Sequence, residues 1–347
     1  MSTAERPTRA IAESRQSMAE IVGSDGLVGQ RMQAGAILDL MDLVAGRVAI
    51  KHSGGRVATL SFDRVDLIYP ILHHDLVRLD GQLVYVGQSS MVIDVRCYRK
   101  DTFTRAFMPI QRCFVTMVAV DDNGRPRKNV PALRYETPEE EAIREEALHH
   151  KALDRQWVAM QEATRERADF TAAEVEESFN REKQEFLTPA ETEITVVRQF
   201  MPRNLNQVGT IFGGDVLQWM DRVATYTARH FTRNRNMVTI AMNRLFFHQP
   251  IFPTDLVEMK ARVTYVRRFT LEVEIDVQLQ RADGAELRSH SGYFTVLNYD
   301  ESGFKRPIIT GLRLQDDDQL GLRRYQQGKD RYYFWKEHQA PQQQSAG

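Results

Sequence analysis

The sequence predicts an α+β protein of two similar domains in tandem, each a long helix followed by an antiparallel sheet that wraps around it. Three observations support this. The chain has 347 residues, more than one hydrophobic core usually serves. One helical pattern occurs twice, beginning at Gly35 and again at Gly214. Each copy is followed by segments rich in β-branched and aromatic residues, which are typical of strands.

The repeat extends over a helix and several strands. The helical segments Gly35–His52 and Gly214–His230 share the pattern M-D-x-V-A. The strand segments then match in pairs, beginning at Val57 and Met237, at Leu83 and Val263, and at Cys113 and Gly292. We expect the two units to pair as a pseudo-dimer whose sheets join edge to edge.

Composition limits the classes of partner. The chain has 46 basic and 47 acidic residues and a net charge of -1, so it has no overall field for nucleic acid or an anionic membrane. Its cysteines, Cys97 and Cys113, cannot form a disulfide framework and lack zinc-ligand spacing, which favours a reducing compartment. No apolar run is long enough to cross a bilayer. We expect a cytoplasmic protein with no metal and no membrane or nucleic-acid partner.

Charge and turn signals divide the chain into segments. We expect a flexible N-terminus over residues 1–14, domains over 15–131 and 191–314, a charged helical linker over 132–190, and a C-terminal tail over 315–347. The segment from Thr137 to Glu140 is typical of a helix start, and a second such start lies at 170–174. A disordered charged tether is the alternative for the linker. The tail frays after Leu314, although the aromatic segment Tyr332–His338 should dock.

An aspartate interrupts the apolar face of each predicted helix. Residues at positions i, i+4, i+7 and i+11 share a helix face. These are Leu38, Asp42, Ala45 and Ala49 in the first unit, and Leu217, Asp221, Ala224 and Ala228 in the second. A buried carboxylate without partners is costly, so each must be hydrogen-bonded, exposed in a cleft or neutralised. The small alanines favour a cleft; a satisfied polar group at a subunit seam is the alternative.

A pair of glycines, Gly213 and Gly214, begins the second helix. A backbone without Cβ lets a ligand approach the free N–H groups at a helix N-terminus, and these groups suit a developing oxyanion. The alternative is that the glycines serve only a tight turn and close packing.

Together these residues resemble the acyl-CoA thioesterases of the hotdog fold. The resemblance rests on the pattern N-x-x-G-x-x-F-G-G followed by M-D-x-x-A-x-x-x-A, which runs from Asn206 to Ala228, and then on Val238-Thr239 and Pro250-Ile251. A G-x-S-S-M segment occurs only in the first unit, as Gly87 to Met91, because Arg267 and Arg268 stand there in the second. The likeness covers both units but neither the linker nor the termini.

The resemblance implies a reaction site between the helices of the two units. In it Asn206 and the Gly214 N–H would face Asp42, which would act as general base or nucleophile. Asp221 would face Leu27 and Ala34, which lack the polarising amide, so we expect one working site per chain. The coenzyme A part of the substrate would contact residues near the helix and strand ends, namely Gly213, Arg229, Arg267, Arg268 and Ser90; for the arginines, a solvated surface charge is the alternative.

The implied activity is hydrolysis of fatty acyl-CoA to fatty acid and coenzyme A, with no cofactor beyond the substrate. A hotdog enoyl-CoA hydratase is one alternative, although His52 and His230 lie about ten residues past the aspartates and His248 reads as a turn residue. A non-catalytic acyl-CoA sensor is another. Exposed strand edges call for burial, so we expect a homo-oligomer, a trimer of double hotdogs.

Overall fold

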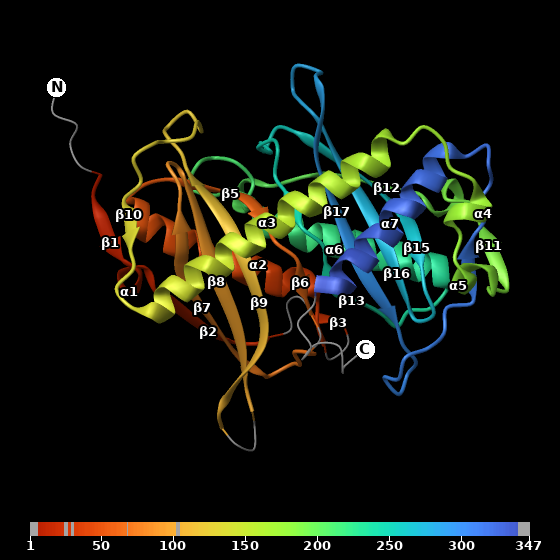
Figure 1. Cartoon of the computed structure of the whole chain (residues 1–347), viewed down its shortest axis with the longest axis horizontal. Coiled ribbons are helices and arrows are strands. Elements are labelled where there is room, and N and C mark those ends of the chain that lie inside the picture. The colour runs from red at the N-terminus through yellow and green to blue at the C-terminus, as the bar shows by residue number, and fades with distance from the viewer. Residues whose placement is uncertain (1–5, 24–26, 29–30, 68, 102–104, 339–347) are drawn as a thin grey trace.

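The computed structural model describes residues 6–23, 27–28, 31–67, 69–101 and 105–338. Two domains lie side by side, each with one long helix against an antiparallel sheet (Figure 1). The predicted α+β class and the tandem arrangement are therefore confirmed.

The first domain is built around helix α2 (Ala34–Ser53). This helix ends at Gly54, whose left-handed backbone (φ 65°) is the usual way to close a helix. The sheet beside it has the strand order β14-β5-β9-β8-β7-β2. The strands of the first domain in this sheet are β2 (Gln16–Ile21), β5 (Val57–Phe62), β7 (Leu76–Val86), β8 (Ser90–Lys100) and β9 (Phe107–Ala119). A short hairpin, β3 (Leu27–Val28) with β4 (Arg31–Met32), precedes α2.

The second domain repeats this plan around helix α6 (Gly213–Thr232). Its sheet has the strand order β12-β15-β16-β17-β13-β6. The strands of the second domain in this sheet are β12 (Ile194–Gln199), β13 (Met237–Met242), β15 (Leu256–Val266), β16 (Thr270–Gln280) and β17 (Glu286–Asn298). Single-turn helices η1 (Ala190–Thr192) and η2 (Pro202–Asn204) flank β12.

The two sheets exchange short strands at their shared edge. Strand β6 (Val65–Asp66) of the first domain pairs with β13, and β14 (Leu245–Phe246) of the second domain pairs with β5. Both pairings are antiparallel, so each sheet continues into the other domain. The predicted edge-to-edge junction is confirmed.

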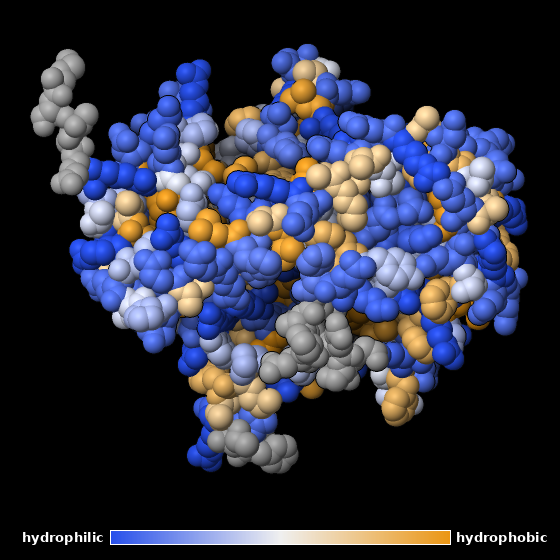
Figure 2. Space-filling view, in the orientation of Figure 1, coloured by the Kyte–Doolittle hydropathy of each residue, from blue (hydrophilic) through white to orange (hydrophobic). Residues whose placement is uncertain are grey.

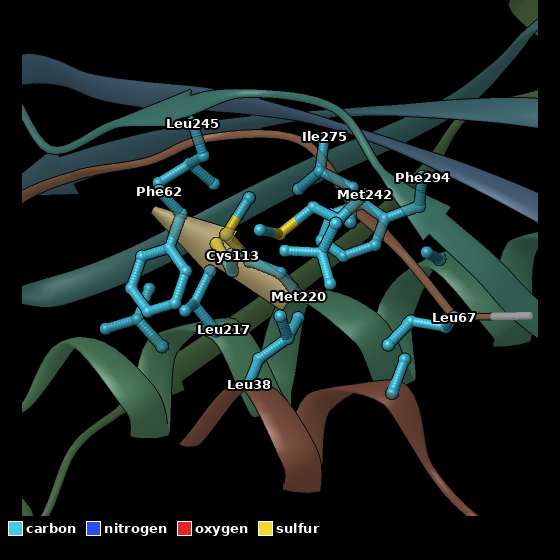
Figure 3. Close-up of a cluster of buried hydrophobic side chains, with 14 of the residues drawn as sticks. Leu38, Phe62, Leu67, Cys113, Leu217, Met220, Met242, Leu245, Ile275 and Phe294 are labelled. Carbon is cyan, nitrogen blue, oxygen red and sulfur yellow. The ribbon is translucent and has the colours of Figure 1, made fainter. Parts of the chain in front are cut away.

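Helices α2 and α6 pack against each other beneath this junction, and the core is continuous across the domains. Figure 3 shows Leu38 of α2 beside Leu217 and Met220 of α6, with side chains of both sheets above them. Gly35 and Gly214 allow the close approach: a Cβ on Gly35 would lie 2.5 Å from Gln218 Cα, and one on Gly214 would lie 2.9 Å from Asp39 Cα. A side chain at either position would push the helices apart.

The linker is largely helical. Helix α3 (Pro138–Glu166) begins at Thr137, whose hydroxyl accepts a hydrogen bond from the Glu140 N–H at 3.3 Å, so this predicted start is confirmed. The helix crosses in front of both sheets (Figure 1). The second predicted start gives only the single turn α4 (Ala172–Val175), followed by α5 (Ser178–Arg181). The linker ends pair in parallel with other segments, β11 (Glu185–Leu187) with β18 (Thr310–Leu312), and β10 (Ala132–Arg134) with β1 (Thr8–Ala10).

The predicted flexible N-terminus is wrong for the part that the structure describes. Strand β1 (Thr8–Ala10) pairs with β10, and the turn α1 (Ile11–Ser14) buries Ile11. The Ser14 hydroxyl accepts a hydrogen bond from the Leu83 N–H at 3.0 Å. An apolar anchor and paired backbone groups hold this segment on the first domain; residues 1–5 lie outside the described residues.

The predicted fraying of the tail is also wrong up to residue 338. Helix α7 (Gln319–His338) covers the outer face of the second sheet, and Trp335 packs near Trp157 of α3. The prediction that the aromatic segment docks is confirmed; residues 339–347 lie outside the described residues. The face that carries α3 and α7 is mainly hydrophilic, with smaller hydrophobic patches (Figure 2). Among the described helices, none has the length and apolar composition needed to cross a bilayer.

Candidate active site

A carboxylate of α2 meets the N-terminus of α6 at the domain interface. Asp42 is fully buried, and its Oδ2 accepts a hydrogen bond from the Gly214 N–H at 2.9 Å. Its Oδ1 accepts one from the Thr59 hydroxyl of β5 at 2.8 Å. The predicted contact between Asp42 and Gly214 is present, and a threonine completes the set.

The reciprocal arrangement is present at Asp221. This side chain is 1% exposed, and its Oδ2 accepts from the Gly35 N–H at 2.9 Å. Its Oδ1 accepts from the Thr239 hydroxyl of β13 at 2.5 Å. Each domain thus presents a carboxylate and a threonine to the helix N-terminus of the other, so both carboxylates are hydrogen-bonded and buried.

The threonines were not recognised as site residues from the sequence. A signal was present, because Thr59 and Thr239 are the third residues of the repeated segments that begin at Val57 and Met237. A threonine facing a helix alone suggests only packing. Its significance follows from the carboxylate that the fold places beside it.

Asn206 does not contact Asp42 through any hydrogen bond of the described residues. Its Oδ1 accepts from the Val208 and Thr210 N–H groups at 2.9 and 3.2 Å, and its Nδ2 donates to the Thr210 hydroxyl at 2.9 Å. These bonds close the loop before α6, where Gly209 has a φ of 81°. In this conformation the amide shapes the loop that leads to the Gly213–Gly214 pair.

The glycine pair serves both packing and hydrogen bonding. A Cβ on Gly213 would lie 2.9 Å from Asp42 Oδ2 and 3.4 Å from Thr59 Oγ1. The Gly214 N–H is donated to Asp42 and is not free for another acceptor. An oxyanion can use this N–H only when the carboxylate shifts.

Three cavities that share lining residues extend from Asp221 toward α7. One of about 20 Å³ is lined by Asp221, Thr239, Arg31, Gln33 and Arg229, with others, and a second, of about 90 Å³, shares Arg31, Gln33 and Thr239 with it. The second cavity also shares Ile240 and Leu297 with a large one of about 490 Å³. The large cavity lies between α7 and the outer face of the second sheet, and its lining includes Arg267, Arg268, Lys305, Tyr332 and Lys336.

The predicted coenzyme A contacts are thus spread over different parts of the site. Arg229 lines the cavity at Asp221, whereas Arg267 and Arg268 line the large cavity. Gly213 lies at Asp42. Ser90 begins β8 in the first domain, where its carbonyl accepts from the Gly87 N–H at 2.8 Å.

Known proteins resemble this chain over both domains. The family model described as thioesterase superfamily matches residues 32–104 and 208–283. The uncharacterized acyl-CoA thioester hydrolase YkhA of Bacillus subtilis is 33% identical over 121 residues, which cover 35% of this chain and 67% of that protein. The chain belongs to the thioesterase superfamily. Its tandem hotdog architecture agrees with the resemblance seen in the sequence.

Longer relatives carry both units. The acetyl-coenzyme A thioesterase of Mus musculus is 25% identical over 306 residues, covering 85% of this chain and 52% of that protein. The chain therefore spans about half the length of the mammalian relatives it matches. Among solved structures, an acyl-CoA hydrolase variant of Staphylococcus aureus in complex with coenzyme A is 27% identical, with a TM-score of 0.42, over 46% of this chain and 95% of that one.

In this member of the superfamily, the charged residues around Asp42 differ in sign from those around Asp221. Burial raises the pKa of Asp42 to about 7, against the hydrogen bonds from Thr59 and Gly214, and the nearby Asp39 and Asp215 raise the pKa further. Burial likewise raises the pKa of Asp39 to about 6, with the charge of Asp215 adding to the effect. Asp42 thus lies in an acidic neighbourhood.

Asp221 lies in a basic neighbourhood. Burial raises its pKa as well, but Thr239 and Gly35 lower the pKa by hydrogen bonding, and the cations Arg229 and Arg222 lower it further. Among the described residues, no group of three or more histidine, cysteine, aspartate or glutamate side chains is placed to hold a metal ion.

The raised pKa of Asp42 predicts a stability effect that depends on pH. The folded protein binds the Asp42 proton more tightly than the unfolded chain, so its stability falls as pH rises from about 4 to about 7 and stays lower above that. Asp42→Asn keeps acceptor and donor atoms for Gly214 and Thr59 without the buried charge. We expect the variant to be more stable than the wild type at pH 8, by at most about 4 kcal/mol, with little difference near pH 4.

Urea unfolding at pH 4.5 and pH 8 measures this difference. The control is Asp122→Asn, which alters a carboxylate that is 91% exposed and should change stability by less than about 0.5 kcal/mol at either pH. The prediction would be contradicted if Asp42→Asn gained less stability over the wild type at pH 8 than at pH 4.5.

Proposed function

We propose that this chain hydrolyses the thioester of fatty acyl-CoA. The observation that carries the proposal is the carboxylate at a helix N-terminus of the opposite domain, with a threonine hydroxyl on its other oxygen. It occurs in a member of the thioesterase superfamily, at the junction of the two domains. The interface holds two candidate sets of residues for the chemistry, Asp42 with Gly214 and Asn206 in one set and Asp221 in the other.

The reaction needs a base and a polarised carbonyl. The carboxylate shifts from the backbone N–H and removes a proton from water as the water oxygen adds to the carbonyl carbon, and the released N–H stabilises the charge that develops on the carbonyl oxygen. The carbon–sulfur bond then breaks, and the proton passes to the sulfur of coenzyme A. The products are the carboxylic acid and the free thiol, and one water molecule is consumed.

The large cavity suits the phosphates of coenzyme A. Arg267, Arg268, Lys305 and Lys336 line it, and among the described residues none of these side chains forms an ion pair with a carboxylate. The neighbouring acids are already paired, Glu272 with Arg331 and Asp66 with Arg64. The lining is therefore cationic, and guanidinium and ammonium groups bind phosphate well. Gly213, Arg229 and Ser90 stay predicted contacts of the substrate.

The hydratase alternative receives no support from the contacts of the carboxylates. Among the described residues, the hydrogen-bond partners of Asp42 and Asp221 are threonine hydroxyls and backbone N–H groups, not histidines. His52 instead contacts the Pro131 carbonyl at 2.8 Å. A non-catalytic acyl-CoA sensor, the other alternative, would bind acyl-CoA in the large cavity without hydrolysing it.

We further propose that the units assemble as a trimer of double hotdogs in the cytoplasm, with no cofactor beyond the substrate. Strands β2 and β12 end their sheets, and Ile21, Val197 and Leu256 on or beside them are exposed. Exposed apolar edges of this kind are usually buried against another chain. Light scattering at micromolar concentration tests the assembly, and a monomeric mass would count against it.

The activity is tested by release of free thiol from acyl-CoA substrates of increasing chain length. We expect turnover in the wild type and a loss of about 10²-fold or more when both carboxylates are replaced, in the double variant Asp42→Asn, Asp221→Asn. Wild-type protein that binds acyl-CoA and releases no thiol would favour the sensor. A double variant that keeps near wild-type turnover would place the chemistry elsewhere.

A further inference from the structure

The two carboxylates have equivalent hydrogen bonds, and a cavity adjoins Asp221. Asp221 and Thr239 line the cavity of about 20 Å³, which is large enough for one water molecule beside the carboxylate. This cavity adjoins the one of about 90 Å³, which in turn adjoins the large cationic cavity. The shared lining residues Thr239, Ile240 and Leu297 lie on β13 and β17, which indicates a path along β13 from Arg267 and Arg268 to Asp221.

Two arginines, Arg31 and Arg229, line the cavity at Asp221, and the matching positions of the other site hold uncharged residues. Arg31 lines both smaller cavities, its guanidinium lies over the Tyr299 ring at 5.1 Å, and no carboxylate partner is found for it among the described residues. Arg229 has a buried Nε without a hydrogen-bond partner in the described part of the chain. The matching residues of the other site, 179 positions away, are Thr210 and Ile50.

An amide also lines the cavity at Asp221. Gln33 precedes α2 as its N-cap residue, and it lines both smaller cavities. Its Oε1 accepts a hydrogen bond from Arg222 Nε at 3.4 Å, which leaves the amide NH₂ without a partner among the described residues. The residue at the matching position of the second domain is Phe212. Leu27, at the place of the expected asparagine, lies in the hairpin strand β3.

We propose that Asp221 is the carboxylate that hydrolyses the thioester, and that Arg31 and Gln33 contact the thioester carbonyl in place of the missing asparagine. The inference rests on the proposed function and deepens it. Asp221 accepts the proton of the attacking water, while the guanidinium and the amide NH₂ stabilise the charge on the carbonyl oxygen. It reverses the prediction from sequence, which placed the working site at Asp42.

The acidic neighbourhood of Asp42 supports the assignment of the hydrolysis to Asp221 rather than to Asp42. Asp39 and Asp215 lie near Asp42, and their charges oppose the approach of a ligand that carries several phosphates. Arg31, Arg222 and Arg229 surround Asp221 instead. The same arrangement of hydrogen bonds thus has acidic neighbours at Asp42 and basic neighbours at Asp221. Only the basic neighbours at Asp221 complement the negative charge of coenzyme A.

The matched pair Asp221→Asn and Asp42→Asn tests the assignment. We expect turnover to fall about 10²-fold or more in Asp221→Asn and by less than about tenfold in Asp42→Asn. If Asp42→Asn is the inactive variant and Asp221→Asn turns over, the assignment is overturned while the proposed function stands. A wild type without thiol release, by contrast, would overturn the proposed function itself.

Arg31 is tested with two substrates, an acyl-CoA and the N-acetylcysteamine thioester of the same acid, which lacks the phosphates. Arg31→Ala should lower kcat about tenfold or more with both substrates, because the residue acts on the carbonyl, and Arg31→Lys should recover part of the loss. Arg268→Ala should raise KM only with acyl-CoA. The control Arg125→Ala, in an exposed turn, should change neither.

Gln33→Leu completes the test, since it is close in size and removes only the amide. A loss in kcat with both substrates, at unchanged thermal stability, is the expected result. If Arg31→Ala and Gln33→Leu both keep wild-type kcat with the short thioester, these residues do not contact the reacting carbonyl and the proposal is wrong.

Discussion

Arg331→Met lowers the free energy of unfolding by about 3 to 5 kcal/mol, because it leaves a buried carboxylate without its charge partner. Arg331 of α7 is 1% exposed and binds Glu272 of β16 through Nη2 at 2.6 Å and Nε at 2.9 Å. Its Nη1 donates to Gln161 of α3 at 2.6 Å, and its guanidinium lies 3.7 Å from the centre of the Tyr293 ring. Urea unfolding measures the loss.

The control for this prediction lies on the same helix. Arg324 pairs with Glu274 at 3.2 Å but is 24% exposed, so Arg324→Met should cost about 1 kcal/mol or less. Adding Glu272→Gln to Arg331→Met should recover part of the loss, because it removes the uncompensated charge. Equal costs for the two arginine variants would contradict the argument.

The same ion pair positions part of the proposed substrate cavity. Tyr332, Trp335 and Lys336, which lie within the next five residues of α7 after Arg331, form one wall of it. We therefore expect Arg331→Met to raise KM for acyl-CoA more than KM for a thioester that lacks the phosphates.

Gly35→Ala lowers the free energy of unfolding by about 3 kcal/mol or more, because the new methyl group would meet backbone rather than a flexible side chain. The Cβ would lie 2.5 Å from Gln218 Cα and 3.0 Å from the Gln218 carbonyl oxygen. The shift that relieves this contact moves α2 away from α6 and lengthens the hydrogen bond between the Gly35 N–H and Asp221. Turnover should fall together with stability.

Gly46→Ala is the matched control, since Gly46 lies on the same helix α2. The nearest atom to its Cβ would be Met117 Cε at 4.0 Å, an ordinary contact. Alanine favours a helix over glycine by about 1 kcal/mol, so this variant should be equally or more stable than the wild type. If Gly35→Ala were as stable as Gly46→Ala, the close approach of the helices would not require glycine.

Local patterns in the sequence were sufficient for the elements and their repeat. The apolar stripe with its aspartate predicted α2 and α6, and every residue of that stripe is buried. Thr137 marked the start of α3 because capping depends on neighbours a few residues away. The edge-to-edge junction followed from the repeat itself, since two units with equal unpaired edges can satisfy each other.

The partners of each carboxylate were decided only by the tertiary structure. Gly214 and Asp42 are 172 residues apart, and Gly35 and Asp221 are 186 residues apart, so the pairs form only when the domains meet. From sequence we expected a defective site at Asp221, because the alignment of the two repeats places Leu27 where the other loop has Asn206. It could not show that Asn206 closes its own loop, or that Arg31 and Gln33 line the cavity at Asp221.

The ordered N-terminus and the full extent of the tail helix were likewise beyond local patterns, although the docking of Tyr332–His338 was predicted. The segment 319–338 has little apolar character of its own, and its stability as α7 comes from a buried ion pair with β16 and aromatic contacts with α3 and β15. Sequence periodicity reports which face of an element is apolar. The charge that surrounds a buried group depends on every element packed against it, and for Asp42 and Asp221 those elements belong to both domains.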